Sequence, residues 1–136
     1  MTVGLPRCGK STWAMEQGCP VVNPDSIRLA LHGQPFIGSA EPYVWAIAKT
    51  MVKSLFLTGH EVVILDATNL TRKRRDEWIS SSWEREFKQF LVAKIVCIRR
   101  AMDTNKEYLI PVIEKMSEER DLIGDDEEGS SPPLKR

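Results

Sequence analysis

The eight residues that begin at Gly4, Gly-Leu-Pro-Arg-Cys-Gly-Lys-Ser, constrain the fold of this chain more than any other feature. They match the phosphate-loop pattern, with both glycines, the lysine and the hydroxyl residue at the required spacing. In such a loop, backbone N–H groups and the N-terminus of the following helix form a cradle for nucleotide phosphates. A strand-like start precedes the loop and a helix-forming segment follows it, so the pattern predicts an α/β fold.

The side chains of the loop predict how a nucleotide binds there. Lys10 would bridge the β- and γ-phosphates, and the Ser11 hydroxyl would bind Mg²⁺. We therefore expect ATP, or another nucleoside triphosphate, together with Mg²⁺. The alternative is a glycine-rich turn with a surface lysine. The predicted nucleotide-binding residues are Gly4, Pro6, Arg7, Cys8, Gly9, Lys10, Ser11 and Thr12.

The length and the cysteine content indicate the class of protein. A chain of 136 residues suits one domain that can bury its own core. Its three cysteines, Cys8, Cys19 and Cys97, are odd in number and lack Cys-x-x-Cys spacing, so neither a disulfide framework nor a zinc site is expected. A cytoplasmic setting fits best, in the host cytoplasm if the protein is viral. No apolar run approaches the roughly 18 residues of a membrane span, so no membrane partner is expected.

The zero net charge hides an uneven distribution. Residues 1–116 carry 16 Lys/Arg and 12 Asp/Glu, whereas residues 117–136 carry 3 and 7. The mild basic excess is compatible with phosphate-bearing substrates, but it is too small for a protein that grips long duplex DNA. The predicted organisation is a phosphate-loop domain over residues 1–120 and an acidic, disordered tail over residues 121–136.

Hydrophobic patterning predicts an alternation of strands and helices. Apolar runs indicate strands at 1–3, 20–23, 61–66 and 90–98. Helical spacing and end signals indicate helices at 10–17, 24–31, 41–57 and 72–87, a helical segment at 101–109 and a last helix from Pro111. The alternation predicts a three-layer α/β/α fold, with a parallel sheet of about four strands covered by helices on both faces.

Polar residues follow the predicted strands where ligands bind in open α/β sheets, at the carboxyl edge. Asp25 and Arg28 follow the second strand, and Asp66, Thr68 and Asn69 follow the third. Asp25 could instead only cap a short helix. Thr68 and Asn69 could form an Asx-type turn that organises the loop.

Together these motifs resemble those of the small phosphate-loop kinases typified by the bacteriophage polynucleotide 5′-kinase, over roughly residues 1–116. The matching segments are Gly4-x-Pro6-x-x-Gly9-Lys10-Ser11-Thr12-Trp13-Ala14, Asn23-x-Asp25-x-x-Arg28, Asp66-x-Thr68-Asn69-Leu70 with Arg74-Arg75-x-x-Trp78, and Ile110-Pro111-x-Ile113. The resemblance implies that Asp25 is the general base for the acceptor hydroxyl and that Arg28 grips the acceptor's phosphate. It also implies that Asp66 holds Mg²⁺ through water, and that Thr68 and Asn69 lie at the acceptor site.

Two basic segments remain open to more than one interpretation. Arg72 and Arg75 belong to a run of four basic residues that could contact nucleic-acid phosphates or form a solvated face. Kinases of this family also close an arginine-bearing lid over the nucleotide. Lys106 stands where that arginine would fall, so either Lys106 supplies a simpler point charge or Arg100 takes the role.

The predicted function is transfer of the γ-phosphate of ATP to a hydroxyl on DNA, RNA or a nucleotide-like acceptor, with Lys10, Asp25, Arg28, Arg100 and Lys106 as the catalytic set. A nucleic acid or a nucleotide-like molecule is the expected partner. Three alternatives stay open. They are a kinase of hydroxymethylated bases in viral DNA, a nucleotide-sugar kinase, and a nucleotide-binding regulator or slow NTPase that transfers to no acceptor.

Overall fold

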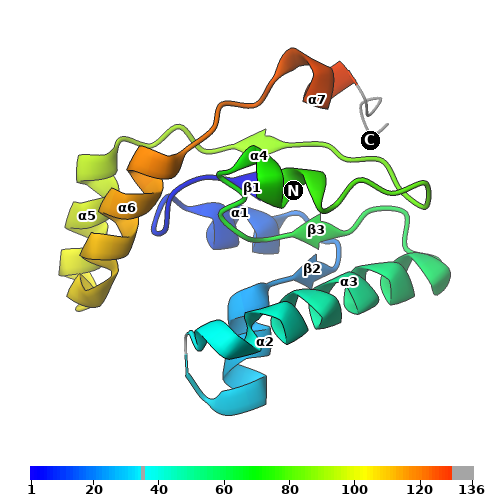
Figure 1. Ribbon diagram of the computed structural model, residues 1–136, viewed down its shortest axis with the longest axis horizontal. Helices are drawn as coiled ribbons and strands as arrows, with labels where there is room; N and C mark the ends of the chain where they lie inside the picture. Colours follow the sequence, from blue (N-terminus) through cyan, green and yellow to red (C-terminus); the bar gives the residue numbers. More distant parts are fainter. Residues whose placement is uncertain (35, 130–136) are drawn as a thin grey trace. The chain divides into compact units, whose positions relative to one another are not determined.

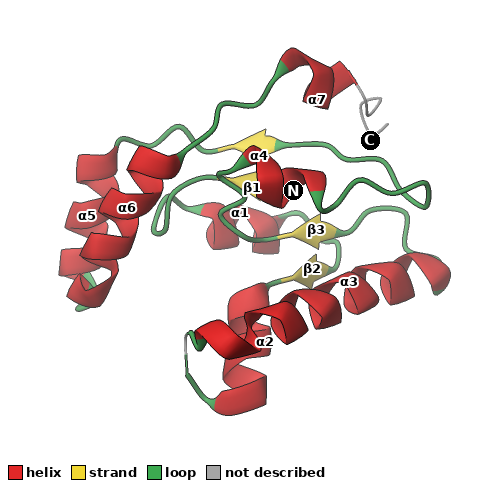
Figure 2. Ribbon diagram, viewed as in Figure 1, coloured by secondary structure: helices red, strands yellow, loops and turns green. Residues whose placement is uncertain are grey.

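The computed structural model describes residues 1–34 and 36–129, which form parts of two compact units (Figure 1). The terminal unit comprises Met1–Lys10 and the described residues from Thr68 to Gly129, and the central unit comprises the described residues of Ser11–Ala67. The phosphate loop therefore lies in the terminal unit up to Lys10, and Ser11 is the first residue of the central unit. Short strands, helices and long loops alternate along the chain (Figure 2).

The central unit is built on two parallel strands. Its elements are most of α1 (Lys10–Glu16), β2 (Val21–Val22), α2 (Pro24–His32), the 3₁₀ helix η1 (Gly38–Ala40), α3 (Glu41–Leu57) and β3 (Ile64–Leu65). Val21 pairs with Ile64 and Val22 with Leu65. Because paired parallel strands end at the same edge, the residues that follow β2 and β3 lie on one side of this unit.

Helix α3 packs through one stripe of small and branched side chains. Val44, Ala48 and Val52, spaced four residues apart, are buried, whereas Tyr43 and Met51 are exposed. This spacing places the buried residues on one face of a helix. The predicted helix over 41–57 is confirmed with these bounds, and the predicted helices over 10–17 and 24–31 are confirmed to within one residue.

The terminal unit contains the other parallel pair. Its elements are β1 (Thr2–Val3), α4 (Arg72–Asp76), β4 (Lys88–Gln89), α5 (Lys94–Asp103), the 3₁₀ helix η2 (Glu107–Leu109), α6 (Ile110–Glu119) and α7 (Asp125–Gly129). Thr2 pairs with Lys88 and Val3 with Gln89. The chain thus has an α/β fold with parallel strands, as predicted. The four described strands form two separate pairs, which differs from the single sheet of about four strands that the pattern predicted.

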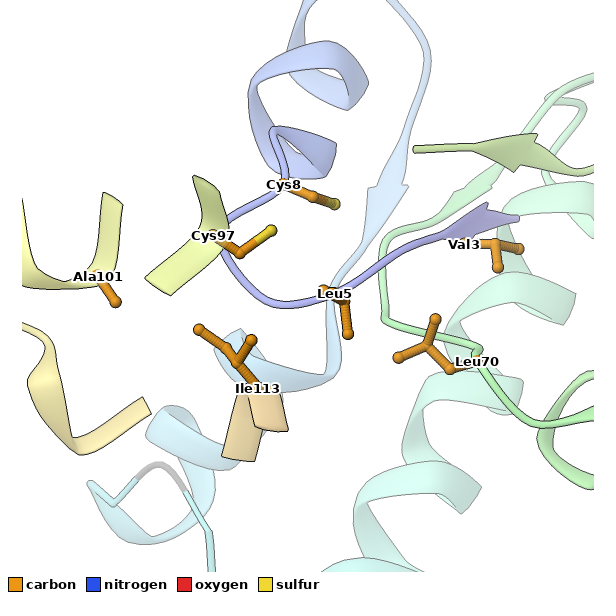
Figure 3. Packing of buried hydrophobic residues seen from close by; sticks show 7 residues of the cluster. All are labelled: Val3, Leu5, Cys8, Leu70, Cys97, Ala101 and Ile113. Atoms are coloured by element: carbon orange, nitrogen blue, oxygen red, sulfur yellow. The ribbon is translucent and has the colours of Figure 1, made fainter. Parts of the chain in front are cut away.

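The core of the terminal unit packs directly against the start of the phosphate loop. Figure 3 shows seven buried side chains that meet there, from β1, the loop, the segment before α4, and helices α5 and α6. They are Val3, Leu5, Cys8, Leu70, Cys97, Ala101 and Ile113. Two of the seven, Leu5 and Cys8, are loop residues, so the loop is held by apolar packing as well as by its backbone.

The predicted strand over 90–98 is wrong over its whole length. Only Lys88–Gln89 form a strand in this region, and residues from Lys94 onward form α5. Cys97 and Ala101 are fully buried, whereas Ile95 is exposed, which is helical rather than alternating burial. A short continuous apolar run fits a buried strand or a buried helix equally well. Arg100 consequently lies within a helix and not at the end of a strand.

The predicted helix over 72–87 is also shorter than expected. Helix α4 ends at Asp76, and the chain then turns through a loop. In that loop the Trp83 side chain donates from Nε1 to the Trp78 carbonyl at 2.9 Å, and Ser80 Oγ accepts from the Ser82 N–H at 3.0 Å. Serine side chains that bond nearby backbone compete with helix formation, which explains the early end.

The predicted tail over residues 121–136 is described as far as residue 129 and contains a helix there. Residues 121–129 include α7, and Glu127 within it is 1% exposed. The Gly124 N–H donates to Glu127 Oε1 at 3.1 Å, an arrangement that resembles half of a helix capping box. Residues 130–136 lie outside the described residues, so the prediction for them stays a prediction.

Candidate functional site

The phosphate loop depends on its two glycines for different reasons. At Gly4, an added Cβ would approach Cys8 Sγ to 2.6 Å and Phe90 Cβ to 2.9 Å, so no larger residue fits. Gly9 has open space around it, but its φ of +99° is one that side-chain-bearing residues rarely adopt. Lys10 Nζ donates to the Leu5 carbonyl at 2.7 Å. The loop therefore has the glycine-dependent turn that the pattern predicted, and the Lys10 ammonium group contacts the loop's own backbone.

Arg7 has a left-handed backbone conformation, with φ of 66°. Its carbonyl accepts a hydrogen bond from Arg100 Nη1 at 3.2 Å. Of the two predicted lid cations, the structure thus brings Arg100 against the loop. Lys106 lies between α5 and η2, where its backbone N–H donates to the Ala101 carbonyl at 2.7 Å. The left-handed region is costly for a residue with a Cβ, so Arg7 carries backbone strain at this point of the loop.

This strain predicts an inverted order of stability at position 7. Arg7→Gly should be more stable than Arg7→Ala by about 1 kcal/mol, because only glycine adopts this φ without cost. Lys53, an exposed residue within α3, serves as the control. There, Lys53→Ala should be more stable than Lys53→Gly by about 1 kcal/mol. Urea unfolding of the four variants measures both differences. Equal stability of the two Arg7 variants would show that the conformation carries no strain.

Ser11 and Asp66, the two predicted metal-binding residues, meet in the central unit. Ser11 Oγ donates to Asp66 Oδ2 at 2.7 Å, and Asp66 is 4% exposed. Asn23 Nδ2 donates to the same carboxylate oxygen at 3.1 Å. A hydroxyl and a carboxylate are hard oxygen ligands, and Mg²⁺ is usually bound by one or two such groups together with substrate phosphates and water. The residues present therefore fit Mg²⁺.

Asp25 and Arg28 also meet, and a third residue holds the arginine. Arg28 Nη1 donates to Asp25 Oδ1 at 2.6 Å. On its other side, Arg28 Nε and Nη2 donate to the two carboxylate oxygens of Glu41 at 2.9 and 2.6 Å. Such a bidentate contact orients a guanidinium strongly. The Asp25 side chain is 76% exposed, so its carboxylate is open to solvent while Arg28 is fixed from behind.

The two carboxylates keep Arg28 charged. Partial burial acts to lower the pKa of Arg28, but the hydrogen bonds and charges of Glu41 and Asp25 outweigh it, and the pKa is raised above its usual value. Sequence reasoning missed Glu41. It lies 13 residues from Arg28 and is the first residue of α3. An acidic residue is common there because it stabilises the N-terminus of a helix, so its presence in the sequence does not point to Arg28.

The structure gives Thr68 and Asn69 loop-organising contacts. The Thr68 carbonyl accepts from the Gly4 N–H at 3.0 Å. Asn69 is 1% exposed, has a φ of 44°, and donates from Nδ2 to the Thr2 carbonyl at 2.8 Å. Thr68 thus ties the segment after β3 to the first residue of the phosphate loop, and Asn69 ties it to strand β1. These contacts and the burial of Asn69 favour the loop-organising alternative for this residue.

Arg75 was predicted to contact the acceptor, and its burial contradicts this. The side chain is 0% exposed, and Nε and Nη2 donate to the two carboxylate oxygens of Glu127 at 2.7 and 3.1 Å. Nη1 also donates to the carbonyls of Asn69 and Leu70, both at 3.0 Å. Arg72 is different, because its side chain is 44% exposed and pairs with Asp126 at the surface. The acceptor-binding role of Arg72 therefore stays a prediction.

Comparison with known proteins assigns the chain to a family. A family model described as an AAA domain matches residues 1–99, so the chain belongs to this family. Among solved structures, the fold is similar to that of a chain in the Pnkp1/Rnl/Hen1 RNA repair complex, with a TM-score of 0.62 and 18% sequence identity over 88% of this chain. This chain spans 45% of the length of that one. No curated protein matches it.

Fold, loop and family together define a phosphate-loop nucleotide-binding protein with a kinase-like α/β fold. Across residues 1–34 and 36–129, no helix has both the length and the apolar character needed to cross a membrane.

Proposed function

We propose that this protein is an ATP-dependent phosphotransferase that moves the γ-phosphate to a hydroxyl on a nucleic acid. One observation carries the proposal. In the central unit, Asp66, which accepts from Ser11, follows β3, and the Asp25–Arg28 pair follows β2, so both sets lie beyond the edge where these paired parallel strands end. A metal-binding pair beside a carboxylate–arginine pair is what transfer between two substrates requires, whereas hydrolysis requires no acceptor site.

We assign donor binding to two groups of residues, the phosphate loop with Lys10 in the terminal unit and the Ser11–Asp66 pair in the central unit. Backbone N–H groups of the loop would hold the α- and β-phosphates, and Lys10 would contact the β- and γ-phosphates. Ser11 and Asp66 would hold Mg²⁺, the second directly or through water. When bound, Mg²⁺ offsets the negative charge that develops on the transferred group.

The acceptor half consists of Asp25 and Arg28. The exposed Asp25 carboxylate would accept the proton of the acceptor hydroxyl as that oxygen attacks the γ-phosphorus. Glu41 and Asp25 engage three of the five N–H donors of Arg28, so two can still bind an acceptor phosphate. Arg28 would thereby fix the acceptor and orient the base at the same time.

A nucleic-acid acceptor is favoured over the alternatives by two observations. The fold is similar to that of a chain in an RNA repair complex, and the motifs resemble those of polynucleotide 5′-kinases. Within residues 1–34 and 36–129, no comparable feature favours a hydroxymethylated base or a nucleotide sugar.

Transfer of label from γ-labelled ATP to a panel of acceptors tests the proposal. The panel comprises 5′-hydroxyl DNA and RNA, hydroxymethylated DNA, nucleosides and nucleotide sugars. We expect label on 5′-hydroxyl strands and none on otherwise identical strands that already carry a 5′-phosphate. Label only on another acceptor would correct the substrate class. Release of labelled phosphate without transfer to any acceptor would overturn the proposal.

A further inference from the structure

We infer that Asn23 is a positioning residue, an inference that rests on the proposed function. Its one side chain orients both the Asp66 carboxylate, which would bind Mg²⁺, and helix α2, which carries the proposed base Asp25. Its Oδ1 accepts from the Asp25 N–H at 2.8 Å, which caps the N-terminus of α2. Its Nδ2 donates to Asp66 Oδ2 at 3.1 Å. A single amide thus contacts the carboxylate of Asp66 and the backbone N–H of Asp25.

The position of Asn23 follows from the local sequence. It comes directly after β2, has an extended backbone with φ −121° and ψ 114°, and precedes Pro24, which begins α2. Extended backbone at the cap followed by proline at the first helical position is a favourable helix start. The parallel pairing of Val22 with Leu65 places the next residues, Asn23 and Asp66, side by side.

Few other side chains could make both contacts. A cap needs an acceptor oxygen, whereas the contact with Asp66 needs a donor, and an amide carries one of each on the same short side chain. Serine or aspartate would retain the cap. Serine is too short to bring a donor to Asp66 as well, and aspartate would place a second negative charge beside it.

The contact matters because Asp66 Oδ2 receives two donors, from Ser11 and from Asn23. A carboxylate already oriented by hydrogen bonds loses less freedom when it binds a metal. Removal of such an outer partner typically lowers metal affinity about 10- to 100-fold. We therefore expect Asn23 to contribute to Mg²⁺ binding without being a ligand.

Asn23→Ser and Asn23→Ala separate this role from the helix cap. The full chain is titrated with Mg²⁺ in the presence of a non-hydrolysable ATP analogue, and binding is followed by calorimetry. Both variants should need about 10-fold or more Mg²⁺ for half-maximal binding of the analogue. Only Asn23→Ala should also show a lower urea midpoint, because serine retains the cap. Ser26→Ala, an exposed change on the same helix, should alter neither quantity.

Unchanged Mg²⁺ dependence in Asn23→Ser would overturn the inference. So would a lower urea midpoint in both variants by the same amount, since that would make Asn23 purely structural. The readout is binding and not turnover. If the unchanged protein binds the Mg²⁺-dependent analogue but transfers phosphate to no acceptor, the proposed function fails while the role of Asn23 is still tested.

Discussion

Asp25→Asn is expected to bind ATP with unchanged affinity and to lose about 10²- to 10⁴-fold in the rate of transfer to a 5′-hydroxyl strand. The amide has the shape of the carboxylate and its Oδ1 can still accept from Arg28 Nη1, a bond of 2.6 Å in the unchanged protein. It cannot accept the proton of the acceptor hydroxyl. Single-turnover label transfer measures the rate, and calorimetry with ATP measures the affinity.

Two further variants show whether the loss belongs to the base. Glu77→Gln changes a carboxylate in another i,i+3 pair, with Arg74, and should leave transfer unchanged. Lys10→Ala should weaken nucleotide binding as well as abolish transfer, since its ammonium group would contact the phosphates. Full activity of Asp25→Asn would refute the assignment of Asp25 as the base.

Glu127→Ala is expected to lower the free energy of unfolding by about 3 kcal/mol, at the lower end of the range for a broken buried ion pair. The change leaves the guanidinium of Arg75 buried without its carboxylate. The carbonyls of Asn69, Leu70, Asp121 and Leu122 still accept from it, which limits the loss. Truncation after Gly124 removes the same carboxylate and should destabilise similarly. Urea unfolding at neutral pH measures each difference.

The neighbouring carboxylate provides the matched control. Asp126 pairs with Arg72 at the surface, so Asp126→Ala should change stability far less than Glu127→Ala. An equal effect of the two substitutions, or no effect of Glu127→Ala, would show that α7 adds nothing to the stability of the terminal unit.

The same pair predicts how the effect varies with pH. The hydrogen bond from Arg75 lowers the pKa of Glu127 below 4.5, against the opposing effect of burial. A carboxyl whose pKa is lowered by folding stabilises the protein above its unfolded pKa, and this contribution is lost as the pH falls through the folded value. The difference between Glu127→Ala and the unchanged protein should therefore shrink as the pH falls below 4.5.

Local sequence patterns predicted those parts of the fold that depend on nearby residues. Repeats of apolar residues predicted α3 with its observed ends, and the phosphate-loop spacing predicted the turn and the helix after it. Asp66 was predicted at the end of a buried strand, and it follows β3. The run 90–98 was assigned as a strand because continuous apolar character does not distinguish strand from helix, and only the packing of Cys97 and Ala101 resolves it.

The sequence by itself determined the phosphate loop, the α/β class and the candidates Ser11, Asp25, Arg28 and Asp66, because these follow from spacing and order along the chain. Tertiary structure alone decided which charges meet. Four consecutive basic residues look alike in the sequence, yet one of them, Arg75, is buried against Glu127, 52 positions away. Ion pairs between distant residues depend on how the elements pack, so the local sequence around one residue does not identify its partner.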